Sequence, residues 1–162
     1  MSRLHRDHEV DRARTLASRY LRFGTRSTAQ LRAYLAARDI PARLIGREIV
    51  ECSRKGWLDD RACATLWATT LADRGYAWAA IHDQLLAKGF DAILIDRLLA
   101  TQAAREPDDI RVRTTADGYV RRRARSGRPL RSGLARHLSS RGFDAELIDR
   151  VLTDSLGPPN DS

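Results

Sequence analysis

The sequence is poor in cysteine, aromatic residues and long apolar runs, and each shortage excludes a class of protein. Its 162 residues include only Cys52 and Cys63, so no disulfide framework holds the fold, and both are predicted to be reduced core thiols. No stretch approaches the roughly 20 apolar residues of a membrane span. The segment from Met1 to Asp11 is charged and lacks the apolar stretch of a signal peptide, which predicts a cytoplasmic protein.

Motifs of well-known enzyme classes are missing as well. The sequence has no Walker loop, no dinucleotide-binding glycine fingerprint and no nucleophile elbow. Its four histidines lack the spacing of metal ligands. The adjacent Asp59 and Asp60 have no evident carboxylate or histidine partners, so helix capping is favoured over an acid pair. We therefore expect a non-enzymatic protein with no metal and no cofactor.

A twelve-residue pattern occurs twice in full and once in a weaker form. Residues 88–99 (KGFDAILIDRLL) return 53 positions later as residues 141–152 (RGFDAELIDRVL), and a weaker copy begins at Arg38. Two apolar residues precede each copy by seven and three positions, which is the spacing of one helical stripe. These pairs are Leu31 and Leu35, Ile81 and Leu85, and Leu134 and Leu138. Three copies of one pattern predict three copies of one structural unit.

The centre of each copy predicts a tight turn between two helices. Gly89 and Gly142 suit the left-handed conformation that ends a helix. Asp91 and Asp144 then stand where the side chain of an N-cap residue accepts free backbone N–H groups of the next helix. Asp39 replaces glycine in the first copy and tolerates the left-handed geometry less well. The repeated module is therefore helix, short turn, helix.

Helical periodicity extends along the chain, and no segment shows the convincing alternation of a β-strand. We predict an all-α fold of three tandem three-helix repeats, because one such unit buries too little apolar surface alone. The predicted repeats are residues 11–56, 57–104 and 105–156, with a flexible charged arm at 1–10 and a disordered tail at 157–162. The three tryptophans are predicted to pack in the core and between repeats rather than to stack on bases: Trp57, Trp67 and Trp78.

The net charge of +8 comes from arginine, since Lys55 and Lys88 are the only lysines among 29 basic residues. A guanidinium fork matches phosphate and carboxylate groups, so nucleic acid is the first partner to consider. A GC-rich genome would explain much of the total but little of the clustering. Residues 12–47 hold nine arginines and one acid, and residues 119–143 hold eight arginines and no acid. In the middle, residues 57–101 hold six aspartates against four basic residues, which are Arg61, Arg74, Lys88 and Arg97.

The arginines of the two basic stretches are the predicted binding residues, with a solvated surface as the alternative. Consecutive helical residues fan round the axis by about 100°, so three arginines in a row cannot all face one partner. Arg121 and Arg125, four positions apart, share a face that two further arginines extend across a turn. The full set is Arg22, Arg26, Arg32, Arg121, Arg122, Arg123, Arg125, Arg128 and Arg131.

Four segments together resemble the RecX family, the bacterial regulators of the RecA recombinase. They are Ser27-Thr28-Ala29-Gln30-Leu31 with Leu35, Gly56-Trp57-Leu58-Asp59-Asp60, Arg74-Gly75-Tyr76 leading to Ile81 and Leu85, and Leu86-Ala87-Lys88-Gly89-Phe90 with Ile95. The resemblance covers residues 12–152 and is strongest from 55 to 99. Cys63, where the family usually has Phe or Tyr, and Asp39 depart from the pattern.

The resemblance implies an elongated, curved all-α monomer of three tandem repeats without catalytic activity. It also implies that the chain binds the RecA filament, lies in its groove and inhibits ATP hydrolysis and strand exchange, in recombination, DNA repair and the SOS response. Binding to single- or double-stranded DNA is expected to be weak. The alternative is a stand-alone DNA-binding protein whose helix-turn-helix-like repeats enter a major groove.

Overall fold

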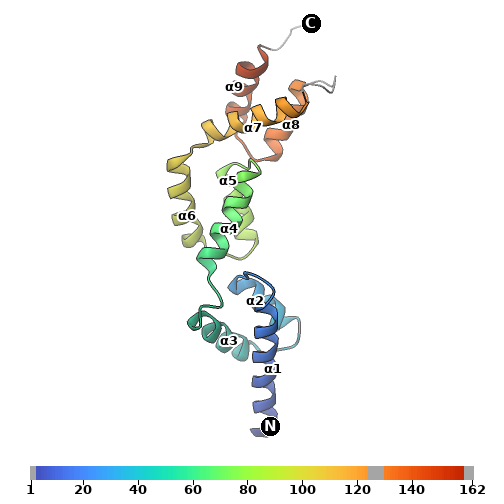
Figure 1. Ribbon diagram of the computed structural model, residues 1–162, viewed down its shortest axis with the longest axis vertical. Helices are drawn as coiled ribbons and strands as arrows, with labels where there is room; N and C mark the ends of the chain where they lie inside the picture. Colours follow the sequence, from blue (N-terminus) through green and yellow to red (C-terminus); the bar gives the residue numbers. More distant parts are fainter. Residues whose placement is uncertain (1–2, 124–129, 159–162) are drawn as a thin grey trace. The chain divides into compact units, whose positions relative to one another are not determined.

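The computed structural model describes residues 3–123 and 130–158, and every regular element in this part of the chain is an α-helix (Figure 1). The prediction of an all-α fold is confirmed. Across the same residues, no helix is both long and apolar enough to cross a membrane. The helices are α1 (Arg3–Leu21), α2 (Thr28–Ala36), α3 (Ala42–Arg54), α4 (Asp60–Asp73), α5 (Trp78–Ala87), α6 (Ala92–Arg105), α7 (Asp108–Arg123), α8 (Leu130–Ser140) and α9 (Ala145–Leu156).

The arm predicted for residues 1–10 is helical from Arg3 on, and its flexibility stays a prediction. Neither glycine nor proline interrupts the chain between Arg3 and Leu21, so a helix that includes Asp11 extends back toward the N-terminus. Val10 packs against the apolar core, and Glu9 accepts a hydrogen bond of 3.3 Å from the Arg43 guanidinium of α3. In the predicted tail, Gly157 caps the C-terminus of α9.

The chain forms two compact units. The first holds the residues up to Leu66 together with Leu86–Asp91, and the second holds Trp67–Leu85 and the residues from Ala92 on. The residues predicted as the middle repeat are thus divided between the two units. The repeat boundaries themselves stay a prediction.

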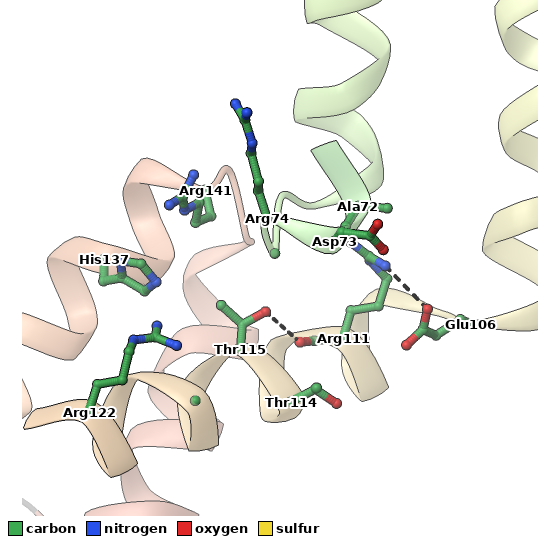
Figure 2. Close-up of a pocket in the computed structure, with 12 residues that line it drawn as sticks. Ala72, Asp73, Arg74, Glu106, Arg111, Thr114, Thr115, Arg122, His137 and Arg141 are labelled. Carbon is green, nitrogen blue, oxygen red and sulfur yellow. Dashed lines mark hydrogen bonds and ion pairs between the residues drawn. The ribbon is translucent and has the colours of Figure 1, made fainter. Parts of the chain in front are cut away.

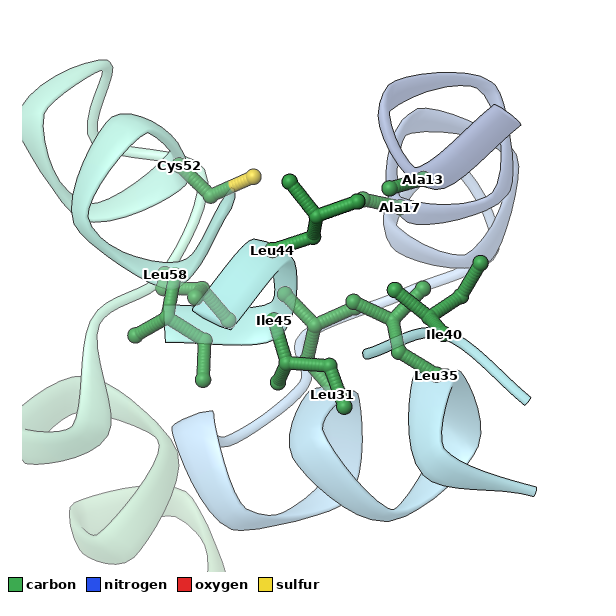
Figure 3. Close-up of a cluster of buried hydrophobic side chains, with 10 residues drawn as sticks. Ala13, Ala17, Leu31, Leu35, Ile40, Leu44, Ile45, Cys52 and Leu58 are labelled. Atoms are coloured by element: carbon green, nitrogen blue, oxygen red, sulfur yellow. The ribbon is translucent and has the colours of Figure 1, made fainter. Parts of the chain in front are cut away.

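In the first unit, α1, α2 and α3 surround one apolar core (Figure 3). The small side chains of Ala13 and Ala17 allow α1 to approach closely, and both are almost fully buried. The stripe of Leu31 and Leu35 on α2 is completely buried, as its spacing predicted. Residues of α3 and its flanking turns complete the cluster: Ile40, Leu44, Ile45, Ile49, Cys52 and Leu58.

In the second unit, α7, α8 and α9 form an equivalent core. Leu134 and Leu138 repeat the buried stripe on α8 and have no exposed surface. Val112 and Ala116 of α7 are also fully buried. The remaining members come from the residue before α5, from α7, from the turn after α8 and from α9: Ala77, Tyr119, Phe143, Ile148, Val151 and Leu152.

One docking arrangement recurs in both units. In the first, the backbone N–H of Thr28, at the start of α2, donates to the carboxylate of Asp60, the first residue of α4, at 2.7 Å. In the second, the backbone N–H of Trp78, at the start of α5, donates to Asp108, the first residue of α7, at 3.2 Å. An aspartate therefore satisfies an orphan N–H of a helix in another part of the chain, as well as standing at the start of its own helix.

A glycine turn packs against the same two helices. A Cβ placed at Gly89 would lie 2.6 Å from the Ala29 Cβ, and one at Gly142 would lie 2.5 Å from the Ala80 Cβ. Real Cβ atoms do not approach so closely, so glycine is required by both contacts and backbone conformation. Asp39 takes the same left-handed conformation in the first copy, with φ of 58° against 84° and 82° for the two glycines.

Short sequence motifs predicted the helix starts well but were a weaker guide to the burial of tryptophan. Ser27 forms a capping box with Gln30 at the start of α2, and Asp144 accepts the N–H of Glu146 at the start of α9. Cys52 and Cys63 are buried free thiols, as predicted, and burial raises the pKa of each. Trp57, predicted to pack in the core and between repeats, is 49% exposed and lies beside Lys55.

We predict that Leu85→Ala and Leu138→Ala each lower the free energy of unfolding by about 2–5 kcal/mol, because both side chains are completely buried. Leu86→Ala is the matched control, since the neighbouring Leu86 is 41% exposed and should cost less than about 1 kcal/mol. Urea unfolding monitored by circular dichroism measures all three. A cost for Leu85→Ala no larger than that for Leu86→Ala would contradict the assigned core.

Candidate anion-binding interface

The predicted binding arginines of the first unit lie around the end of α1 and on α2. Arg22 directly follows α1, Arg32 lies on α2, and both are exposed. Arg26 is half-buried, with its guanidinium carbon 5.0 Å from the centre of the Tyr20 ring. Arg22 and Arg32 therefore offer free charge to a partner, while Arg26 is partly committed to packing.

An aromatic stack fixes this corner of the first unit. The rings of Tyr20 on α1 and Tyr34 on α2 stack with their centres 4.0 Å apart. The guanidinium of Arg38 lies 3.5 Å from the Tyr34 ring centre and donates to the Tyr34 carbonyl at 3.0 Å. Such stacked cations contribute roughly 0.5–1 kcal/mol at partly exposed sites. We interpret the stack as a fastening of α1 to α2.

In the second unit, three predicted arginines form the last turn of α7. Arg121, Arg122 and Arg123 are all exposed, and the helix dipole favours positive charge at this end. They face different ways, as helical geometry predicted. Arg121 lines a cavity with Asp117 and Asp154, Arg122 lines another cavity, and Arg123 lies over the Tyr119 ring at 5.3 Å.

The remaining predicted binding residues are Arg125, Arg128 and Arg131. Arg131 on α8 donates to the carbonyl of Gly157 at 2.6 Å, so it fastens the end of α9 and already has an internal partner. Arg125 and Arg128 lie outside the described residues. The face that Arg121 and Arg125 were predicted to share, extended by Arg128, therefore stays a prediction.

A cationic pocket of about 390 Å³ lies in the second unit, beside the end of α4 (Figure 2). Arg122 of α7, Arg141 after α8 and Arg74 after α4 line it together with His137 of α8. In the view of Figure 2, His137 lies between Arg141 and Arg122. None of these three arginines has a carboxylate within ion-pair distance among the residues that the structure describes. Asp73 and Glu106 also line the pocket, but its four arginines outnumber them, so the lining is positive overall.

Arg111 is the buried side chain that builds the pocket wall. It is only 5% exposed, and its guanidinium donates to the carbonyls of Ala72 and Tyr76 at 3.1 and 2.6 Å. The same group pairs with Glu106 at 3.2 Å and Asp108 at 3.6 Å. Two carbonyls and two carboxylates thus hold the guanidinium, although its Nε has no hydrogen-bond partner, so Arg111 positions the turn after α4. Burial raises the pKa of Asp108, against the opposing effects of the Trp78 N–H and Arg111.

Two glycines make room for the pocket arginines. A Cβ at Gly75 would lie 2.8 Å from the Thr115 hydroxyl oxygen, so this glycine allows the turn that carries Arg74 to approach α7. A Cβ at Gly118 would lie 3.3 Å from the Arg122 guanidinium. The absence of both side chains lets two arginines that are distant in sequence line one cavity.

His137 lies in a strongly positive environment. Its ring packs against Tyr119, with ring centres 4.9 Å apart. Burial lowers the pKa of His137, and the charges of Arg141, Arg122 and Arg123 lower it further. The imidazole is therefore held neutral at neutral pH and keeps one N–H donor.

The His, Cys, Asp and Glu side chains of the described residues do not gather into a metal site. Within residues 3–123 and 130–158, no group of three or more His, Cys, Asp or Glu side chains is arranged to hold a metal ion. His82 lies 3.2 Å from Asp96 and 3.4 Å from Asp83, both of which are well exposed. Asp59 caps its own helix by accepting the Ala62 N–H at 2.9 Å, and Asp60 accepts the Thr28 N–H. The capping interpretation of this aspartate pair is confirmed.

Sequence reasoning missed three residues of the pocket. Arg74 belongs by sequence to the acidic middle stretch, and Arg141 and His137 were not among the predicted binding residues. The signal for Arg141 was present, since it stands at the basic position of the repeated pattern. Its backbone also receives the Ala77 N–H at 2.9 Å, which fixes it beside the pocket.

Comparisons with known proteins give one consistent result. The chain is 30% identical over 120 residues to the regulatory protein RecX of Yersinia enterocolitica, covering 72% of this chain and 68% of that protein. It is 31% identical over 151 residues to the RecX of Thermobifida fusca, covering 90% and 79%. The chain belongs to the RecX family. No family model matches the sequence.

Solved RecX structures share this fold. The crystal structure of RecX from Lactobacillus salivarius superposes with a TM-score of 0.71 at 19% identity, over 91% of this chain and 97% of that one. A second crystal structure, of a regulatory protein RecX, gives a TM-score of 0.68 at 20% identity, over 88% and 71%. The family resemblance stated from the sequence motifs is thus confirmed, together with the helical fold.

We predict that Arg111→Ala lowers the free energy of unfolding by roughly 2–4 kcal/mol, because it leaves two carbonyls and two carboxylates without a shared partner. The matched control is Arg113→Ala, two residues along α7. The Arg113 side chain is 61% exposed and pairs with Asp154 at 3.6 Å, so its loss should cost less than about 1 kcal/mol. Denaturant unfolding compares the two, and equal costs would refute the positioning role of Arg111.

We predict that His137 reduces stability in mild acid. Because its pKa is lowered from 6.5 in the folded protein, the unfolded chain binds the proton more readily. The free energy of unfolding should therefore fall as the pH drops through 6.5 toward the lower folded value, and be unaffected by this residue above that range. Urea unfolding of the wild type and His137→Gln across pH 5–8 isolates the effect. The same pH profile in both proteins would show that His137 titrates normally.

Proposed function

We propose that this chain is a non-enzymatic regulator that binds the RecA filament and inhibits its ATP hydrolysis and strand exchange. Membership of the RecX family carries this proposal, because the relatives are regulatory proteins. Binding rather than catalysis also agrees with the chemistry of the described side chains, which present cations and apolar packing. A cytoplasmic monomer acting in recombination and DNA repair completes the proposal.

The charge distribution supports an anionic partner. Arg121, Arg122 and Arg123 project from one helix end without an acid among residues 119–143. Maintaining such a cluster costs repulsion that a polyanion would relieve. A RecA filament carries DNA and acidic side chains, and either would complement these arginines. Contact residues of the first unit in this proposal are Arg22, Arg26 and Arg32.

A stand-alone DNA-binding protein is the second candidate, favoured by the same arginines. It predicts tight binding to bare duplex with a steep dependence on salt and no effect on RecA. The filament regulator predicts weak binding to bare DNA and inhibition of RecA at low protein concentration. A RecA ATPase assay on single-stranded DNA, with the purified chain added, separates the two. Unchanged ATP hydrolysis at saturating protein would reject the regulator.

We predict that replacing Arg121, Arg122 and Arg123 together by Gln raises the concentration needed for half-inhibition of the RecA ATPase by about tenfold or more. Each substitution removes an exposed contact charge, which weakens binding while leaving the helical core intact. Titration of the variant into the ATPase assay gives the concentration, and a thermal melt checks the fold.

The control variant has the same change in net charge, made at three other arginines. Arg61 and Arg97 lie in the acidic middle stretch, and Arg105 lies just beyond it. All three are exposed and are replaced together by Gln. This variant should inhibit within about twofold of the wild type. Equal losses in the two triple variants would show that only net charge matters and that the α7 arginines are a solvated surface.

A further inference from the structure

We propose that the cationic pocket of the second unit binds a phosphate group of a polynucleotide backbone. The pocket brings together Arg122, Arg141 and His137, with Arg74 at its edge. The inference deepens the proposed function and rests on it in one respect, which is that the partner carries DNA. The ligand is a phosphate group, and the residues that would hold it are Arg122, Arg141 and His137.

Unneutralised charge is the first argument. Arg111, the fourth arginine of the pocket, is paired with Glu106 and Asp108 and satisfies two backbone carbonyls. The charges of Arg122 and Arg141 have no such partners in the described part of the chain. Two cations held near each other repel, and the charges of Arg141 and Arg122 add to the effect of burial in lowering the pKa of His137. An anion in the pocket would relieve this repulsion.

The fixed orientation of Arg141 is the second argument. Its guanidinium lies 4.4 Å from the centre of the Tyr76 ring, and its backbone carbonyl accepts the Ala77 N–H. Its Nε is buried and has no hydrogen-bond partner. A buried donor without an acceptor is unfavourable, so this atom favours a ligand that brings oxygen into the pocket.

Shape distinguishes phosphate from carboxylate. A carboxylate is planar and is satisfied by the fork of one arginine, whereas phosphate oxygens accept hydrogen bonds from several directions. Figure 2 shows Arg122 and Arg141 on either side of His137, and Arg74 reaching away from Thr115 at the edge. Donors therefore approach from two chain segments, the end of α7 and α8 with its following turn. Such an arrangement suits a phosphate group on an extended chain.

The test measures binding without RecA, so its failure is distinct from failure of the proposed function. Fluorescence anisotropy follows a dye-labelled oligothymidylate as wild type, Arg122→Gln or Arg113→Gln is added. We expect Arg122→Gln to weaken binding about tenfold, the loss of one charge-assisted contact, and Arg113→Gln less than about twofold. Arg113 is the matched control because it lies on the same helix, is exposed, pairs with Asp154 and lines a different cavity. Equal weakening by both variants would overturn the pocket in favour of a diffuse field.

Nuclear magnetic resonance of the His137 ring locates the ligand. We expect oligothymidylate to shift the His137 resonances in the wild type, and inorganic phosphate to shift the same resonances at higher concentration. A shift with inorganic phosphate alone would overturn the polynucleotide source. A shift with a glutamate-rich peptide and none with oligothymidylate would assign the pocket to acidic protein segments and refute the proposal. Inhibition of RecA, measured on the same variants, tests the proposed function separately.

Discussion

An aspartate carboxylate that accepts a backbone N–H from a helix elsewhere in the chain is the interaction on which this structure depends. Asp60 does this for α2 and Asp108 does it for α5. Four N–H groups at each helix start lack intrahelical partners, so a carboxylate there satisfies both hydrogen bonding and the dipole. The glycine turns at Gly89 and Gly142 then pack against the same helices. Repetition of one short sequence pattern thus produces repetition of one docking geometry.

The docking of α7 also creates the candidate site. Asp108 and Arg111 lie one turn apart on α7, and together they hold the start of α5 and the turn after α4. Arg111 pairs with Glu106 and Asp108 within the protein, whereas Arg122 and Arg141 pair with no carboxylate in the described part of the chain. The same contacts that stabilise the second unit therefore leave a positively charged pocket on it. The buried guanidinium of Arg111 therefore affects both the stability of the second unit and the charge of its pocket.

For a regulator without catalytic groups, this coupling has a functional consequence. A binding surface made of mobile arginines loses side-chain entropy when it engages a partner. Arg141 is already fixed by the Tyr76 ring and by its backbone, so less entropy is lost there on binding. Arg121, Arg122 and Arg123 are more exposed. The second unit thus combines one preorganised cation with several exposed ones.

The sequence by itself determined the helical class, the buried stripes and the helix caps, because these depend on neighbours within a few residues. Leu31, Leu134 and their partners are buried as spacing predicted, and Asp39 takes the glycine-like turn. The family resemblance was likewise carried by short local motifs. Charge runs were a weaker guide, since they did not distinguish Arg131, which fastens Gly157, from the exposed Arg122.

Only the tertiary structure decided which distant residues share a site. Arg74 and Arg141 are 67 positions apart and come to one pocket because Gly75 packs on Thr115 and Arg141 receives the Ala77 N–H. The burial of Arg111 was equally invisible, since its partners are backbone carbonyls that any sequence possesses. The exposure of Trp57 and the helical state of residues 3–10 also depend on packing. Local pattern fixes the elements, whereas the pairing of charges depends on long-range contacts that no local pattern encodes.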